Sequence, residues 1–181
     1  MEFGERSRFA ITVTLDENHC GTWLFGRLCY WIAGRQIGNF DEVVSLSDVL
    51  TAMTWTVGDC GSREHCSLFR SEKEYAFAAI DNALYCSEYP DTTDVKAMSD
   101  EEAPDGFDVS IRMSMFNSWK VYLVECGDEA KFLYRKKCEE IQEAVLKSGE
   151  FDAAIKATQR LIEAWDAQEV ARGANREAGE L

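Results

Sequence analysis

Residues 21–50 have the sequence GTWLFGRLCYWIAGRQIGNFDEVVSLSDVL, and this stretch decides the fold. Apolar side chains occupy both alternating faces of residues 23–32, which is typical of a strand that is covered on both sides. Gly26 within the strand indicates a bulge or a close approach of another backbone. Ala33 and Gly34 predict a tight turn into a second strand at residues 35–40. We therefore expect residues 23–32 to lie centrally in a sheet.

Further strand patterns lie on both sides of this stretch. Residues 8–15 alternate between apolar and polar side chains, which predicts a half-buried strand paired antiparallel with residues 23–32. Alternation returns at residues 107–113, 119–125 and 130–135, and turn residues separate these three runs. They predict a second, three-stranded antiparallel meander.

Four helices are expected between and after the strands. Ser45 followed by Asp48 and Ser71 followed by Glu74 resemble capping boxes, so each pair predicts a helix start. Apolar positions at helical spacing predict two more helices, at residues 139–147 and 151–165. The sequence after Gln168 is polar and aperiodic, which favours a frayed tail.

Together these patterns predict an α+β fold. Its mainly antiparallel sheet has about six strands, in two hairpin or meander sections, and is packed with four helices. The expected organisation is a single domain at residues 1–168 and a polar, frayed tail at residues 169–181.

The charge balance narrows the classes of partner. The chain of 181 residues has a formal net charge of −14, which argues against direct contact with nucleic acid or an anionic membrane and favours a basic protein partner. The sequence contains no apolar run long enough to span a bilayer and no secretory signal pattern, so a cytoplasmic location is expected. Seven cysteines without an export signal indicate a reducing compartment.

Motifs that carry known chemistry are missing from the sequence. There is no P-loop, no GxGxxG after a strand, no GxSxG, no HExxH and no CxxC, and the acidic pairs lack the spacing of a calcium loop. We therefore expect no enzymatic activity, no cofactor and no metal site. Cys66 beside His65, with Cys60 nearby, is the remaining candidate for cysteine chemistry; the simpler interpretation is a turn between two helices.

Several stretches resemble the immunity protein 42 family of bacterial polymorphic toxin systems. They are FGERSRFAI at 3–11, WLFGRLCYWI at 23–32, GNFDE at 38–42, SLSDVL at 45–50, WKVYLVE at 119–125 and GEFD at 149–152. The resemblance implies a non-catalytic protein that binds a cognate toxin domain in the cytoplasm and blocks it. A basic nuclease would suit so acidic an inhibitor. The alternatives are a small cysteine-dependent enzyme, or a structural or adaptor subunit of a stable assembly.

Acidic residues are the candidates for toxin contact. Residues 87–106 include both prolines and are longer than an ordinary connection between elements. Their alternative role is that of a disordered, solubilising loop. Asp41 and Glu42 form a second acidic patch. The candidate contact residues are Glu88, Asp91, Asp94, Asp100, Glu101, Glu102 and Asp105, together with Asp41 and Glu42.

Overall fold

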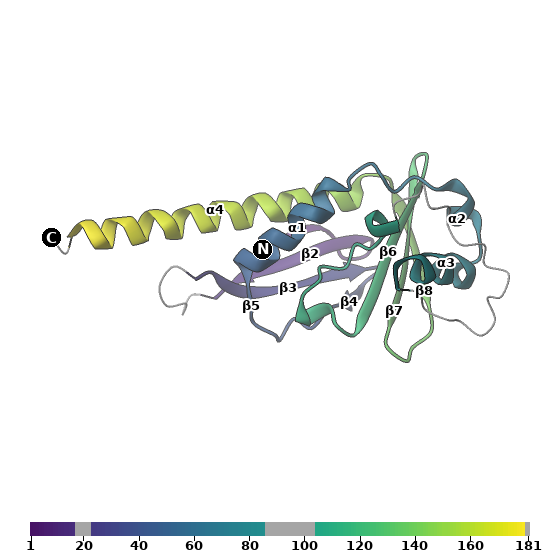
Figure 1. The fold of residues 1–181 in the computed structure, drawn as a ribbon, viewed down its shortest axis with the longest axis horizontal. Helices are drawn as coiled ribbons and strands as arrows, with labels where there is room; N and C mark the ends of the chain where they lie inside the picture. The colour runs from purple at the N-terminus through teal and green to yellow at the C-terminus, as the bar shows by residue number, and fades with distance from the viewer. Residues whose placement is uncertain (17–22, 86–103, 180–181) are drawn as a thin grey trace.

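The computed structural model describes residues 1–16, 23–85 and 104–179. Within these residues the chain forms eight strands in two antiparallel sheets, together with four α-helices (Figure 1). The α+β class and the antiparallel pairing that the sequence predicts are confirmed. The strands divide between a five-stranded and a three-stranded sheet, so there are more of them than the expected six.

The five-stranded sheet is built from the N-terminal residues. Its strands are β1 (Glu2–Glu5), β2 (Phe9–Leu15), β3 (Phe25–Ile32), β4 (Arg35–Ile37) and β5 (Val44–Ser45). The order is β1-β2-β3-β4, and β5 also pairs with β3. The expected second strand at residues 35–40 is therefore shorter and ends at Ile37.

The central position predicted for β3 is confirmed. β3 pairs with β2 from Phe9↔Ile32 to Leu15↔Gly26, and with β4 and β5 on its other side. A Cβ atom on Gly26 would lie 2.1 Å from the carbonyl oxygen of Thr14, so this close backbone approach requires glycine. Ala33 and Gly34 both have positive φ, at 49° and 80°, as a tight hairpin turn demands.

The prediction that β3 is covered on both faces is confirmed only in part, because Cys29 on the outer face is fully buried but its neighbours there are not. On the inner face Leu24, Leu28, Tyr30 and Ile32 are fully buried. On the outer face Trp23 is 64% exposed and Trp31 is half-buried. Trp31 is shielded because the Arg6 guanidinium lies 4.0 Å from its ring centroid and because its Nε1 donates to Thr12 Oγ1 at 2.9 Å. Local side-chain contacts thus partly cover the outer face.

The helices are α1 (Leu46–Gly58), α2 (Cys66–Arg70), α3 (Lys73–Tyr85) and α4 (Glu150–Gly179). The start of α1 is as predicted, because Ser45 Oγ accepts from the Asp48 N–H at 3.2 Å. The predicted cap at Ser71 is wrong. Ser71 ends the short helix α2, and its hydroxyl donates to the Ser67 carbonyl oxygen at 2.7 Å.

The three-stranded sheet differs from the predicted meander. Its strands are β6 (Trp119–Cys126), β7 (Glu129–Lys136) and β8 (Gln142–Lys147). The helix predicted at residues 139–147 is wrong, because residues 142–147 pair with β7 as an edge strand. A short apolar run fits either period, and the neighbouring strand decides between them.

The strand predicted at residues 107–113 is also wrong. Phe107 ends a 3₁₀ turn, η1 (Pro104–Phe107), and the residues after it meet β6 at the isolated bridge Asp108↔Tyr122. A second 3₁₀ turn, η2 (Ser114–Phe116), leads into β6. The apolar residues of the alternating pattern, Phe107, Val109 and Ile111, are buried, but the segment that carries them is irregular and not a strand.

The predicted frayed tail is replaced by helix. α4 continues through residues 169–179, and Figure 1 shows its C-terminal half projecting beyond the sheets. The segment contains many strong helix formers, and the buried first half of α4 supplies the nucleus from which helix propagates.

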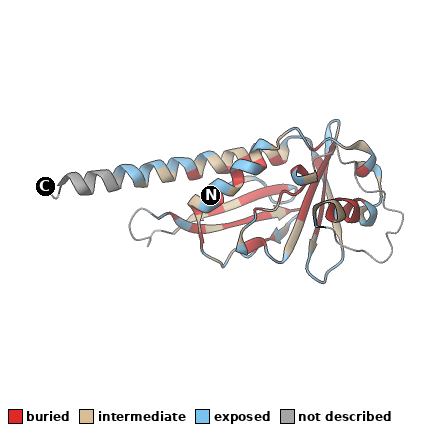
Figure 2. Cartoon of the chain, in the orientation of Figure 1, coloured by how far each residue is buried: buried red, intermediate tan, exposed pale blue. Residues whose placement is uncertain are grey.

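Two apolar cores hold these layers together (Figure 2). The larger core lies between the inner face of the five-stranded sheet, helices α1 and α4, and one face of the three-stranded sheet. The smaller core packs the opposite face of the three-stranded sheet against α2 and α3. The three-stranded sheet is therefore buried on both faces, and it fixes the segment that leads into β6.

Candidate functional site

A groove of about 560 Å³ opens between α1 and the segment that precedes β6. Its lining includes four carboxylates and one guanidinium, so its formal charge is strongly negative. The charged lining residues are Asp48, Asp59, Asp105, Asp108 and Arg112.

Helix α1 forms one wall of the groove. Asp48, Trp55 and Asp59 follow one another at helical spacing, so they share the face opposite the buried positions Val49 and Met53. The indole of Trp55 is 76% exposed. A large aromatic side chain in this position can supply much of the energy of a protein interface.

The opposite wall is irregular but well supported. Asp105, in η1, is exposed and lies 3.4 Å from the Arg112 guanidinium. Asp108 is buried; it accepts from the Tyr85 hydroxyl at 2.8 Å and from the Ser110 N–H at 3.1 Å. Burial, and then the neighbouring Asp108 carboxylate, raises the pKa of Tyr85, so the phenol remains a hydrogen-bond donor.

A second buried carboxylate supports α3 against β6. Asp81 is fully buried; it contacts the Lys120 ammonium and accepts from the Tyr122 hydroxyl at 2.5 Å. Burial and the Asp81 hydrogen bond raise the pKa of Tyr122. Because β6 also carries the bridge to Asp108, these bonds help to hold the irregular wall in place.

The structure brings only part of the predicted contact set to this groove. Asp105 lines it. Asp41 and Glu42 lie in the loop between β4 and β5, where Asp41 is exposed and Glu42 is partly exposed. Glu88, Asp91, Asp94, Asp100, Glu101 and Glu102 lie outside the described residues.

Exposed apolar side chains near the pairing of β3 with β5 are called here the aromatic patch. It consists of Trp23, Phe25 and Val43, which are all exposed. Pairing of β3 with β5 sets Phe25 opposite Ser45, two residues after Val43, so the patch is close to the start of α1. This patch and the loop carboxylates form a surface of mixed apolar and acidic character.

Among the charged and aromatic residues of the groove, sequence reasoning identified only Asp105 and missed Asp48, Trp55, Asp59, Asp108 and Arg112. The sequence pattern indicates only a capping role for Asp48. The spacing of Asp48, Trp55 and Asp59 on one helix face was a usable signal. The position of Asp108 followed no local pattern, because the bridge to Tyr122 sets it.

The cysteine-dependent alternative is wrong for Cys66. Cys66 forms a disulfide with Cys126, so it holds no free thiolate. His65 Nδ1 instead accepts from the Leu68 N–H at 3.2 Å and caps α2. The disulfide also departs from the reducing compartment that the cysteine usage indicates.

Two further features of the described residues concern metal binding and the membrane. Residues 1–16, 23–85 and 104–179 contain no group of three or more histidine, cysteine or carboxylate side chains that could hold a metal ion. Within the same part of the chain, no helix combines the length and apolar character needed to cross a membrane.

Comparison with known proteins adds two likenesses. The sequence profile of a family described as immunity protein 42 matches residues 1–160. The crystal structure of CdiI from Burkholderia dolosa AUO158 is similar with a TM-score of 0.69 and 24% identity, covering 87% of this chain and 97% of that one. This second likeness concerns the fold. Among curated proteins, no sequence matches this chain.

Proposed function

Since the chain belongs to the immunity protein 42 family and is a toxin-neutralising immunity protein, we propose that it works by occlusion without catalysis. It binds a cognate toxin domain and covers the surface that the toxin needs for its activity. The groove between α1 and the segment before β6 is the principal contact, and a basic segment of the toxin occupies it.

One observation carries this proposal: an exposed tryptophan stands in a groove of carboxylates. Trp55 offers a rigid aromatic anchor, while Asp48, Asp59 and Asp105 offer complementary charge to lysine or arginine. A cation that approaches the Trp55 ring gains a cation–π contact in addition to the ion pairs. The combination suits a protein surface that is both basic and partly apolar.

The charge of the chain supports one kind of toxin. A nuclease must neutralise phosphates with lysine and arginine, so its substrate surface is basic. A chain of net charge −14 is attracted to such a surface and competes there with nucleic acid. We infer that the toxin is a basic nuclease and that neutralisation takes place in the cytoplasm, where the nucleic acid is.

A second contact area supplements the groove. Asp41 and Glu42 stand beside the aromatic patch, close to the Asp48 end of α1. A toxin domain that covers the groove can reach this area as well, and the patch adds apolar burial to its acidic edge. The predicted contacts at Glu88, Asp91, Asp94, Asp100, Glu101 and Glu102 remain part of the proposal.

The test is co-purification with the toxin-like domain encoded beside this gene, at low and high salt. In the groove variant, Asp48 and Asp105 are both changed to lysine. In the matched control, the exposed residues Glu140 and Glu163 are changed to lysine, which alters the net charge equally. We expect the groove variant to lose the complex and the control to keep it.

Salt dependence separates the two parts of the surface. A wild-type complex that weakens as salt rises supports contact through the carboxylates. A salt-insensitive complex that survives in both variants would move the contact to the aromatic patch. Failure of the wild-type protein to bind the toxin domain would overturn the proposed mechanism.

A further inference from the structure

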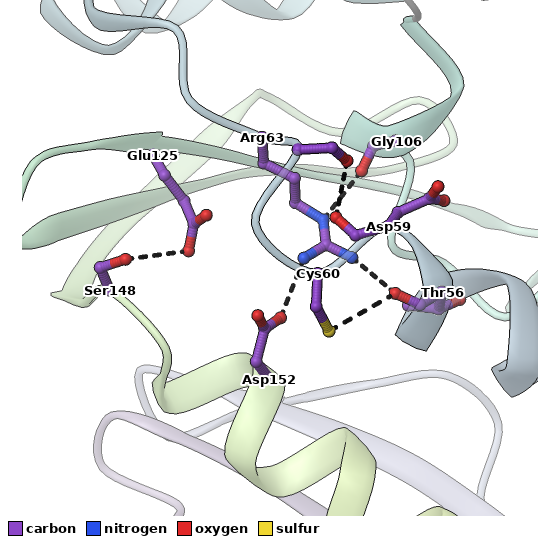
Figure 3. A network of polar contacts seen from close by, with 9 residues as sticks. Thr56, Asp59, Cys60, Arg63, Gly106, Glu125, Ser148 and Asp152 are labelled. Atoms are coloured by element: carbon purple, nitrogen blue, oxygen red, sulfur yellow. Dashed lines mark hydrogen bonds and ion pairs between the residues drawn. The ribbon is translucent and has the colours of Figure 1, made fainter.

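Arg63 is a fully buried cation in the linker between α1 and α2. Figure 3 shows its guanidinium at the centre of a set of polar contacts from several elements. Burying a charge is costly unless it is paired and hydrogen-bonded, so each of these contacts has a function in the fold.

Three hydrogen bonds join this side chain to three separate elements. Arg63 Nη2 donates to the Thr56 carbonyl oxygen of α1 at 2.7 Å. Its Nε donates to the Gly106 carbonyl oxygen of η1 at 2.8 Å. Its Nη1 donates to Asp152 Oδ1 of α4 at 2.9 Å. The planar guanidinium holds its donors at fixed angles, so it fixes the positions of the three acceptors relative to one another.

Two of these acceptors belong to the walls of the groove. Thr56 lines the groove on α1, and Gly106 directly follows the lining residue Asp105. The third acceptor, Asp152, supplies the opposite charge from outside the groove. The hydrogen bonds to the Thr56 and Gly106 carbonyls therefore position the walls, while the separate bond to Asp152 compensates the charge of Arg63.

The backbone of Arg63 is itself anchored to the three-stranded sheet. The Glu125 N–H donates to the Arg63 carbonyl oxygen at 2.8 Å, and the His65 N–H donates to the Glu125 carbonyl oxygen at 2.8 Å. Arg63 Cζ also lies 5.3 Å from the ring centroid of Phe151. The guanidinium is thus a fixed point to which both walls of the groove are attached.

We propose that Arg63 is the positioning residue of the acidic groove. It sets the separation of α1 and η1, and thereby the arrangement in which Asp59 and Asp105 meet the toxin. It is buried and does not touch the partner. The inference rests on the proposed function, in which this groove receives a basic segment.

The test compares two variants of Arg63 with one variant of its counter-ion. Arg63→Lys keeps a cation for Asp152 but cannot reach both wall carbonyls, and Arg63→Met removes every side-chain donor. Asp152→Asn is the matched control, because it removes the ion pair and leaves both wall bonds. Circular dichroism defines a temperature at which the variants are folded, and Kd for the adjacent toxin domain is measured there.

We expect affinity to fall at least about tenfold in both Arg63 variants and to stay within about twofold in Asp152→Asn. Hydrogen exchange of the free proteins gives an independent reading. In Arg63→Lys, amides at residues 105–108 should exchange about tenfold faster than in wild type, with a smaller change in Asp152→Asn.

The outcomes distinguish the two proposals. If the wild-type protein does not bind the toxin domain, the proposed mechanism fails, and the exchange rates of η1 still report on Arg63. Wild-type affinity in Arg63→Lys, or unchanged exchange at residues 105–108, would overturn the positioning role. An equal loss of affinity in Asp152→Asn would also overturn the positioning role, because it would show that the variants lose affinity through a general loss of stability.

Discussion

The disulfide between Cys66 and Cys126 joins the first residue of α2 to the last residue of β6. Its two Cα atoms are 4.8 Å apart, and 60 positions separate the residues in the sequence. The bond closes beside the parallel backbone bridge Glu64↔Glu125. Covalent and hydrogen bonds therefore fasten the same linker, the one that carries Arg63, to the three-stranded sheet.

Removing this disulfide should lower thermal stability. A cross-link over a loop of this length restricts the unfolded chain, so we expect Tm to fall by about 5–15 °C when Cys66 and Cys126 are both changed to serine. Differential scanning calorimetry of the oxidised proteins measures the shift. Cys138→Ser is the control, because Cys138 is an exposed free cysteine. A reductant should destabilise the wild type and leave the double variant unchanged; an equal effect on both would contradict the prediction.

Trp55→Ala should weaken toxin binding without unfolding the protein. A buried interface tryptophan commonly contributes 2 kcal/mol or more, so we expect Kd to rise about 30-fold. Tm should change little, because Trp55 is 76% exposed and lies outside the core. Titration calorimetry measures the affinity. Tyr75→Ala, at an exposed aromatic on α3, is the control, and a similar loss of affinity there would count against a specific role for Trp55.

The buried thiol of Cys29 should make the folded protein less stable as the pH rises into the alkaline range. Burial raises its pKa from 9.0 to about 12, so the folded protein retains a proton that the unfolded chain releases. This contribution is complete below pH 9 and is lost as the pH rises towards 12. Above pH 9, the free energy of unfolding of the wild type should therefore fall relative to that of Cys29→Ala. The expected shift is at most about 1.4 kcal/mol per pH unit.

Urea unfolding at pH 8 and pH 10 measures this difference. Cys138→Ala is the matched control. Cys138 is exposed, so this substitution removes a thiol without removing a buried one. The same pH effect in both variants would show that burial of Cys29 is not its cause.

Removing the projecting part of α4 should leave the domain intact. Among the α4 side chains that the structure describes, Trp165 is the last one that packs against the larger core, so we expect a chain ending at Gln168 to keep its Tm within about 3 °C. A chain ending at Arg160 also loses Ile162 and Trp165, and its Tm should fall by about 10 °C or more. Thermal unfolding of both truncations decides this. Equal destabilisation by the two would place residues 169–181 within the domain.

Much of the N-terminal fold was predictable because its signals are local. The turn at Ala33 and Gly34 needs positive φ, and Ser45 caps α1 through its own hydroxyl. The apolar residues of β3 indicated a central strand, which the pairing confirms. Each of these features depends on neighbours a few residues away, so the sequence contains the information directly.

The C-terminal half was less predictable because pairing partners decide it. Residues 142–147 have a pattern that fits a short helix, but β7 offers an unpaired edge and they join it. Residues 107–113 alternate like a strand, yet only Asp108 makes a bridge to β6. In both cases long-range hydrogen bonds outweigh a weak local preference.

The candidate site shows the same division. The acidic character of the chain could be inferred from the sequence, and Asp105 could be named as a candidate contact residue. Trp55 and Asp59 could not be joined to Asp105, because α1 and η1 are far apart in the chain and meet only in the fold. Arg63 gave no signal at all, since a single arginine in a polar linker is ordinarily solvent-exposed.

The sequence by itself determined the charge, the central hairpin, the start of α1 and the membership of an immunity family, because these depend on composition and on neighbouring residues. Only the tertiary structure decided that carboxylates from separate segments share one groove with Trp55. It also decided that a buried guanidinium joins the walls of that groove. Three acceptors from three elements converge on Arg63 only when the sheets and helices have packed. The physical reason is that a buried charge must find its partners wherever the fold places them.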